Sequence, residues 1–437
     1  MTAAAEPIGT LFWKRLRDPA AWMTTADVVA VLLAASLPWS TSLVGIFGVV
    51  LVLVMLPTID AGALIASLKR PSCVAPIALF VLALAGTLWS DARWGLRFYS
   101  VAPTAKLLLM PLLFYHFERS RRGLWVFTAF LASCAVMVVA SWIVAYFPQL
   151  TLKAQDVAAR GVFVKNYIDQ SQEFALCAVA LAYPIATLLR ANRLVLALVL
   201  GGLSLGFLAN MVFVIVSRTA LVTIPIMLAA FAVLHLRWKT TLMALCACLF
   251  AGVVFWFASP QLETTVATFG QQYNEYMATG ATTSIGQRLE FYRKSLHFFS
   301  EAPVIGHGTG SIEGLFVQSA IGQTGAAAEV VRNPHNQTLN VAVQWGTLGV
   351  VVLYTMWISH LLLFRGVGLA NWIGLLVVVQ NIFTSLFNSH IFDFHEGWMY
   401  VLGVGIAGGL VRRFEVPDGL AASPLQELQI QSRIRRD

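Results

Sequence analysis

The chain has 437 residues, of which 58% are hydrophobic and only 11% are charged, and its mean hydropathy is +0.75. Soluble domains carry roughly a quarter charged residues, so the composition excludes a water-soluble globular protein. The net charge of +8 could suggest a nucleic-acid partner, but the cations are distributed around apolar runs, and we expect membrane lipids and no nucleic acid.

Apolar runs long enough to cross ~30 Å of hydrocarbon recur along the chain and predict an all-α integral membrane protein with about twelve transmembrane helices. The first run follows Lys14, Arg15 and Arg17 and lacks a cleavage site at the right distance, so we expect a permanent span rather than a cleaved signal. The expected ranges are 24–38, 42–57, 74–90, 99–117, 124–147, 171–189, 194–216, 219–235, 240–258, 338–363, 368–387 and 397–411.

The Lys and Arg residues predict the orientation of these helices. If the N-terminus is cytoplasmic, most of the cations fall in inner segments, as the positive-inside rule requires, so both termini should be cytoplasmic. The expected organisation is a cytoplasmic N-terminal segment at 1–23, nine transmembrane helices in 24–258, a long outer loop at 259–337, three transmembrane helices in 338–411 and a cytoplasmic tail at 412–437.

Cations on the outer side oppose this bias and therefore need another role. They occur in the turn with Arg93 and Arg97, in the loop 148–170, at Arg218 and in both halves of the long loop. Within that loop, residues 286–303 place apolar side chains on one helical stripe (Leu289, Tyr292, Leu296 and Phe299), which predicts an amphipathic helix on the bundle or the membrane surface. Simple snorkelling of Arg218 and a solvated helix face around Arg288 are the alternative interpretations.

Asn333-Pro334-His335-Asn336 opens a predicted helix at the border of lipid and water. The Asn-Pro pair favours a turned backbone before the helix. A helix start favours anions and lowers the pKa of an imidazole, which would leave His335 neutral and able to accept a proton. A lone His is usually structural, but this position favours a functional one.

Other polar residues near the outer face are open to two interpretations. Lys106 lies inside a predicted span, where a charge is costly, so it should face a cavity or an acidic partner. His390 and His395, with Asp393 and Glu396, could suggest a metal site but more often such residues are polar members of a turn. The outer segments contain no Asp-x-Asp pair of the kind that holds a divalent ion.

Five stretches together resemble the O-antigen ligase and polymerase superfamily of membrane glycosyltransferases. They run in family order from the third predicted span to the tenth: LWSDARWGLR (88–97), GVFVKNYIDQSQ (161–172), VSRTAL (216–221), QRLEFYRKSLHFFSEAPVIGHGTGS (287–311) and NPHNQTLNVAVQWGTLG (333–349). The resemblance implies a GT-C-like fold in the bacterial inner membrane with its active site on the periplasmic face. Within the superfamily, the sequence looks most similar to the ligases that join O-antigen to lipid A-core.

The resemblance also implies the substrates and the site. The donor would be a glycan on undecaprenyl pyrophosphate, held by Arg218 and Arg288, and His335 would be the catalytic residue. Arg160 and Lys165 are further candidates for the donor pyrophosphate, although contact with the acceptor or with lipid head groups is an equal alternative for them and for Arg93 and Arg97. The candidate acceptor or phosphate contacts are Arg93, Arg97, Arg293, Lys294, Arg332 and Asn336.

We expect no metal and no other cofactor, because cationic side chains can neutralise the leaving pyrophosphate, and a one-step displacement would invert the anomeric centre. An O-antigen polymerase and a protein O-oligosaccharyltransferase would share this chemistry and differ in the acceptor. A lipid-linked glycan flippase is the alternative from another functional class, but transport requires no neutral His beside an Arg cluster.

Overall fold

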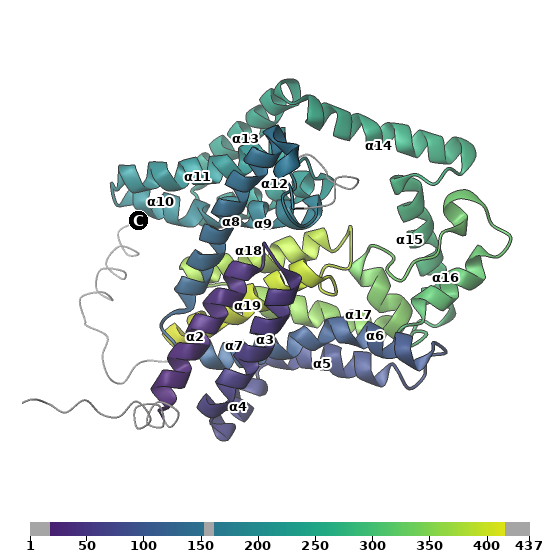
Figure 1. The fold of residues 1–437 in the computed structure, drawn as a ribbon, viewed down its shortest axis with the longest axis horizontal. Helices are drawn as coiled ribbons and strands as arrows, with labels where there is room; N and C mark the ends of the chain where they lie inside the picture. Colours follow the sequence, from purple (N-terminus) through teal and green to yellow (C-terminus); the bar gives the residue numbers. More distant parts are fainter. Residues whose placement is uncertain (1–17, 153–160, 416–437) are drawn as a thin grey trace, which may run out of the picture.

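The structure is a computed structural model that describes residues 18–152 and 161–415, and it is helical throughout these ranges apart from turns (Figure 1). Arg160, the segment 1–17 and the tail 416–437 lie outside the described residues. The predictions made for them remain predictions.

The helices follow the apolar runs of the sequence, and each of the twelve predicted ranges overlaps one or two of them. The helices of the first half are α2 (Pro19–Ser36), α3 (Thr41–Met55), α4 (Ala61–Leu68), α5 (Pro71–Ala85), α6 (Trp94–Ala105), α7 (Leu109–Phe117), α8 (Gly123–Tyr146), α9 (Tyr167–Ala180) and α10 (Ala182–Arg190). Those of the second half are α11 (Leu194–Phe213), α12 (Arg218–His235), α13 (Trp238–Ala258), α14 (Pro260–Thr279), α15 (Ser284–Glu301), α16 (Ile312–Ala320), α17 (Gln337–Leu363), α18 (Leu369–Thr384) and α19 (Phe394–Glu415).

Several of these helices have the length and hydropathy of membrane spans. Within the described residues, seven helical stretches qualify, and the pair α4 and α5, bent by 83°, would make an eighth if it forms one broken span. Two shorter apolar helices, α12 and α18, fall below that length. The predicted class of an all-α membrane protein is therefore confirmed, while the number of twelve spans and the GT-C-like arrangement stay predictions.

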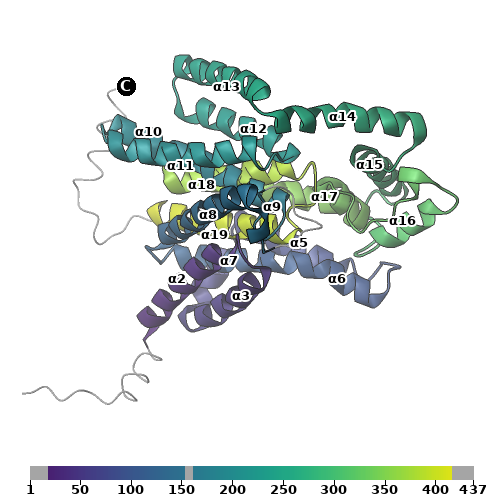
Figure 2. The same ribbon diagram turned by 45° about the horizontal axis from the view of Figure 1, so that its top comes forward.

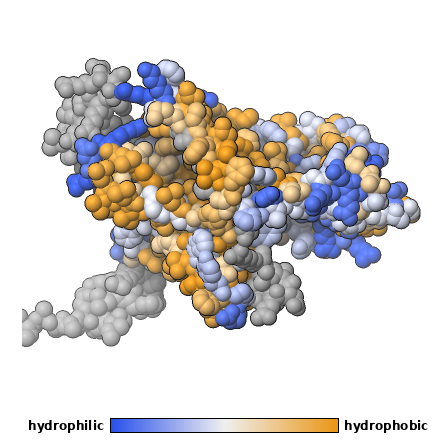
Figure 3. Space-filling view, turned by 90° about the horizontal axis from the view of Figure 1, so that it is seen from above, coloured by the Kyte–Doolittle hydropathy of each residue, from blue (hydrophilic) through white to orange (hydrophobic). Residues whose placement is uncertain are grey.

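The surface has the polarity expected of a membrane protein with one large polar end. Figure 3 shows predominantly hydrophobic residues over the middle of the molecule and a concentration of hydrophilic ones at the right-hand end. In Figure 1 that end carries α14, α15 and α16, which extend beyond the bundle (Figures 1 and 2). These helices come from the predicted outer loop, so the loop folds into a helical cap instead of a linker.

The bundle is centred on α19, which packs against α7 and α18, while α17 packs against α5. The cap is attached to this centre because α15 packs along α17. A small apolar cluster at that contact contains Phe291, Phe298, Phe316 and Val343. The element that carries Arg288 therefore lies against the element that follows His335.

The packed face of α15 differs from the one that the sequence predicted. Phe291 and Phe298 are 3% and 4% exposed, whereas Leu289 and Leu296, members of the predicted stripe, are 40% and 56% exposed. Both pairs are seven residues apart, so both satisfy helical periodicity. Periodicity finds the helix but cannot say which of two apolar stripes contacts the protein.

α17 is interrupted at Gly346, whose backbone angles are φ 60° and ψ −157°. The loop after α15 fills the break: Pro303 and Val304 accept from the N–H groups of Thr347 and Leu348 at 2.8 and 3.1 Å. A Cβ at Gly346 would lie 2.4 Å from the Val304 carbonyl, so only glycine fits this close backbone approach.

Candidate active site at the start of α17

His335 lies in the turn that precedes α17, with a backbone φ of 55°. This left-handed conformation is rare for residues other than glycine and is strained by roughly 1–2 kcal/mol. It is held by the Asn333 side chain, whose Oδ1 accepts from the His335 N–H at 2.9 Å. The next residue, Asn336, caps α17 by accepting from the Leu339 N–H at 3.0 Å. The backbone conformation of His335 therefore directs its imidazole away from α17 and toward α15.

The imidazole of His335 is half-buried between α15 and the loop 385–393. Its ring stacks on Phe291 with centroids 6.0 Å apart and an interplanar angle of 26°. Its Nδ1 lies 3.0 Å from Oδ1 of Asn388. Its Nε2 makes no hydrogen bond within the described residues and is not fully enclosed. Nδ1 is therefore held by a hydrogen bond, and Nε2 is available to accept one.

Tyr292 connects α15 to both sides of this turn. Its hydroxyl lies 2.6 Å from the carbonyl oxygen of Leu386 and 3.1 Å from that of His335. The same helix thus supplies the stacking ring of Phe291 and a donor to the backbone of His335, which fixes the imidazole relative to α15.

Arg288 lies one helical turn before Tyr292 and is half-buried. Within the described part of the chain it makes no hydrogen bond or ion pair. Its charge nevertheless acts on His335: burial lowers the pKa of His335 below its ordinary 6.5, and the positive charges of Arg288 and His390 lower it further, against the hydrogen bond to Asn388, which raises it. The site therefore combines a neutral imidazole with a cation that has no partner among the described residues.

Such a pair can bind an anion and accept a proton in the same place. An unpaired guanidinium presents several N–H donors to a phosphate. An imidazole of lowered pKa is mostly unprotonated near neutrality and can act as a general base. The charge of Arg288 acts on His335, so the structure brings these two predicted residues into one region, whereas the side chain of Arg218 lies outside the described part.

Residues 203–354 match a family model described as O-antigen ligase. This part of the chain is similar to the O-antigen ligase family. A comparison with curated proteins gave no match. The matched region runs from within α11 to within α17, so it includes Arg218, Arg288 and His335.

Arg218, the second predicted donor contact, is the first residue of α12. Its side chain lies outside the described part of the structure, so its proposed contact with the donor stays a prediction. Ser217 occupies the N-cap position but makes no side-chain capping bond. The helix as a whole packs against α9, α13 and α18.

Lys165, predicted to contact the donor, is half-buried just before α9 and donates to the carbonyl of Leu37. Burial lowers its pKa, and the carboxylates of Glu173 and Asp169 oppose that shift. Lys165 therefore belongs to a buried polar region beside α9. Its contact with a donor remains a prediction, and Arg160 lies outside the described residues.

Five of the six candidate acceptor contacts, all except Arg93, already form hydrogen bonds or ion pairs within the protein. Arg293 pairs with Glu290 at 2.7 Å, and Arg332 pairs with Glu313 at 2.8 Å. The buried Lys294 donates to the carbonyl of Ala327. Asn336, as described, caps α17. These contacts explain the residues structurally, and binding of substrate by any of them stays a prediction.

Arg93 and Arg97, the other two candidates, lie where α6 begins. The guanidinium of Arg97 donates to the carbonyls of Ala92 and Thr87 at 2.5 and 2.6 Å. Arg93 is exposed and lines an outward pocket of about 920 Å³ between α6 and α16. Tyr99 and Arg332 also line this pocket, which is large enough for sugar residues.

A buried polar cluster lies next to the turn that contains His335. His390, Asp393 and Glu396 have ligand atoms within 4.8 Å of one another, a spacing that a metal ion could use. Lys106 reaches the same place, where its Nζ donates to the carbonyls of Phe392 and Asp393. Lys106 was expected to face a cavity or an acidic partner, and the carboxylates of Asp393 and Glu396 are close enough to act on its charge. An ammonium group next to the two carboxylates reduces the negative charge that would attract a cation.

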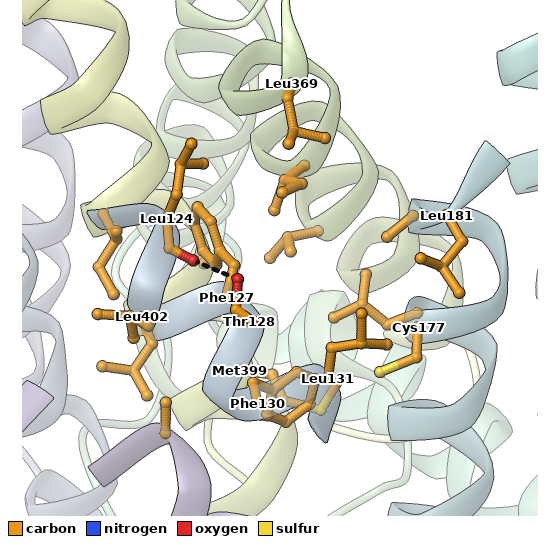
Figure 4. A pocket seen from close by; sticks show the side chains of 18 of the residues that line it. Leu124, Phe127, Thr128, Phe130, Leu131, Cys177, Leu181, Leu369, Met399 and Leu402 are labelled. Atoms are coloured by element: carbon orange, nitrogen blue, oxygen red, sulfur yellow. Dashed lines mark hydrogen bonds between the residues drawn. The ribbon is translucent and has the colours of Figure 1, made fainter. Parts of the chain in front are cut away.

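A second pocket, of about 220 Å³, lies among α8, α9, α18 and α19 (Figure 4). Figure 4 shows the hydrocarbon side chains of Phe127, Leu131 and Leu402 around it, and none of its lining residues is charged. It offers space for an apolar chain but no group for acid–base chemistry. The polar turn at His335 is therefore the better candidate for a reactive site.

Asn388 and Asp393 are the members of the site that the sequence did not single out for a role at His335. Asn388 Nδ2 donates to Asp393 Oδ2 at 2.6 Å, on the opposite side of the amide from His335. Both residues lie 53 or more positions from His335 in the chain, and no motif links them. The only signal was the density of polar residues in 388–396.

Proposed function

We propose that this protein transfers a glycan from undecaprenyl pyrophosphate to a sugar hydroxyl of lipid A-core on the periplasmic side of the inner membrane. The observation that carries the proposal is the His335 imidazole of lowered pKa, within reach of the charge of Arg288. Among the described residues, neither Nε2 of His335 nor the Arg288 guanidinium has a hydrogen-bond partner. The match of residues 203–354 to the O-antigen ligase family supports the same chemistry. The outer cap of helices α14–α16 gives this site a polar environment for sugars.

The proposed reaction is a single displacement. The acceptor oxygen attacks the anomeric carbon of the donor, the bond from that carbon to the pyrophosphate oxygen breaks, and undecaprenyl pyrophosphate leaves with the bonding electrons. Nε2 of His335 takes the proton of the acceptor hydroxyl. Arg288, with Arg218 as the second predicted donor contact, offsets the charge that grows on the leaving oxygen. Attack from the side opposite the leaving group inverts the anomeric centre.

Metal independence is the first prediction from this scheme. Transfer by protein treated with excess EDTA and dialysed should equal that of untreated protein, because guanidinium groups neutralise the pyrophosphate. The measurement is product formation before and after adding Mg²⁺, Mn²⁺ or Zn²⁺. Activity that disappears on chelation and returns with one ion would contradict the scheme and would direct attention to His390, Asp393 and Glu396.

The second prediction identifies the reaction and the acceptor. Purified protein in vesicles, given lipid-linked glycan and lipid A-core, should form lipopolysaccharide and release undecaprenyl pyrophosphate. Cells lacking the protein should accumulate full-length lipid-linked glycan, whereas loss of a polymerase would leave single repeat units. Transfer to protein hydroxyls would identify an O-oligosaccharyltransferase. Movement of the donor across vesicles without any new glycosidic bond would contradict the transferase proposal and indicate a flippase.

A further inference from the structure

The hydrogen bonds around His335 determine which of its nitrogens carries the proton. Asn388 Oδ1 accepts from the backbone N–H of Ser389 at 3.0 Å. A backbone N–H can only donate, so this atom of Asn388 is the amide oxygen. Because an oxygen of this kind only accepts, the Nδ1 of His335 at 3.0 Å must be the donor. In the neutral ring, Nε2 is then the acceptor.

The orientation of the Asn388 amide is fixed from two further sides. Asn333 Oδ1 accepts from the His335 N–H, so Asn333 Nδ2 is a donor, and it lies 2.9 Å from Asn388 Oδ1. On the other side, Asn388 Nδ2 donates to the Asp393 carboxylate at 2.6 Å. Rotation of the amide by 180° would place its NH₂ group against two donors and its oxygen against a carboxylate. The observed orientation is therefore strongly preferred.

We propose that Asn388 is a positioning residue that holds His335 in the tautomer with a free Nε2, and that Asp393 holds Asn388 in turn. The inference rests on the proposed function, because a tautomer matters only if His335 removes a proton. Because Asn388 holds the proton on Nδ1, the Nε2 of the neutral ring has no proton and can accept one from the acceptor hydroxyl. A His335 free to exchange tautomers or to rotate would be a base for only part of the time.

Several charged groups face this arrangement and set the pH at which it operates. They come from every element packed around the turn: Arg288 and Tyr292 on α15, His390 and Asp393 in the loop before α19, Glu396 on α19 and Lys106 at the end of α6. Burial raises the pKa of Asp393 to about 7. The hydrogen bond that His335 Nδ1 donates to Asn388 raises the pKa of His335, against burial. Removal of Asn388 should thus make His335 a weaker base.

The test is a pH profile of transfer by full-length protein in vesicles, measured for wild type, Asn388→Ala and the exchange Asn388→Asp with Asp393→Asn. Asn388→Ala should lower kcat about 10- to 100-fold and leave the KM of the donor unchanged. The acidic limb of its pH–rate profile should move to lower pH. The exchange keeps one amide and one carboxylate, but the carboxylate now accepts the hydrogen bond from Nδ1–H of His335. In the exchanged protein, kcat should therefore recover in part, and the acidic limb should move to higher pH.

Three results would overturn this inference. Asn388→Ala with wild-type kcat and an unmoved limb would show that His335 needs no such support. Asn388 would be a structural residue only if Asn388→Ala lost activity in any of three ways: without a shift of the acidic limb of the pH–rate profile, with a raised KM of the donor, or with a lowered thermal unfolding temperature. If His335→Asn, measured in parallel, retains wild-type activity, then there is no base to position and the proposed mechanism fails with it. If His335→Asn is inactive while Asn388→Ala has wild-type activity, only the positioning role of Asn388 is rejected and the proposed reaction stands.

Discussion

Replacement of His335 by Asn or Ala should lower the rate of glycan transfer by about 10²–10⁴-fold, the usual contribution of a positioned general base. His335→Asn is the sharper variant, because Asn tolerates a left-handed backbone such as the φ of 55° found here but offers no basic nitrogen. Donor binding should be retained, since the pyrophosphate is assigned to arginines. Initial rates and the donor Kd of each purified variant in vesicles provide the measurement.

The pH dependence of the wild-type rate should also reflect the pKa of this base. Burial and the charge of Arg288 hold the pKa of His335 below 6.5, so the rate should rise with pH through a midpoint below that value and level off near neutrality. His297→Ala is the matched control: His297 is exposed on α15 and lies 3.3 Å from Glu301. A His335 variant as active as this control would remove the general-base assignment.

Arg288→Ala should reduce kcat/KM for the lipid-linked donor by about 10- to 100-fold, because one charge-assisted hydrogen bond to phosphate contributes roughly 1.5–3 kcal/mol. The loss should exceed that expected from a surface arginine, since Arg288 is half-buried and has no carboxylate partner among the described residues. Arg288→Lys should recover part of the activity, as it keeps the charge but not the forked donors.

Saturation curves for each substrate separate donor from acceptor effects. The KM of the donor should rise in Arg288→Ala while that of the acceptor stays near the wild-type value. Arg365→Ala provides the control, because Arg365 is exposed in the turn between α17 and α18, which the sequence assigns to the opposite face. If the two variants have equal donor kinetics, Arg288 has no role in binding pyrophosphate.

Much of the fold follows from the sequence because lipid leaves few alternatives to helices. The ends of α8, α11 and α17 lie within a few residues of the predicted ranges. The 83° bend between α4 and α5 and the break at Gly346 were not predicted. The break at Gly346 depends on the distant loop 303–308, which replaces helical hydrogen bonds in α17, and the bend lies where Pro71 begins α5. Local hydropathy gives no information about either feature.

The candidate site was predicted unevenly for a related reason. Arg288 and His335 could be singled out because their positions conflict with simpler roles: a cation outside the positive-inside pattern and a histidine at a helix start. Asn388 has no such conflict, since an Asn in a turn is ordinary. Its role becomes visible only when the structure places it between His335 and Asp393.

The backbone bonds across Gly346 have a mechanical consequence for how large substrates enter. His307 and Gly308, just after α15, donate to Val343 and Gln344 in α17 at 2.9 and 2.8 Å. The helix with Arg288 and the helix that begins beside His335 are thus joined by the main chain and should move together as one body. In the proposed reaction, the spacing between these two residues would then be preserved through each turnover.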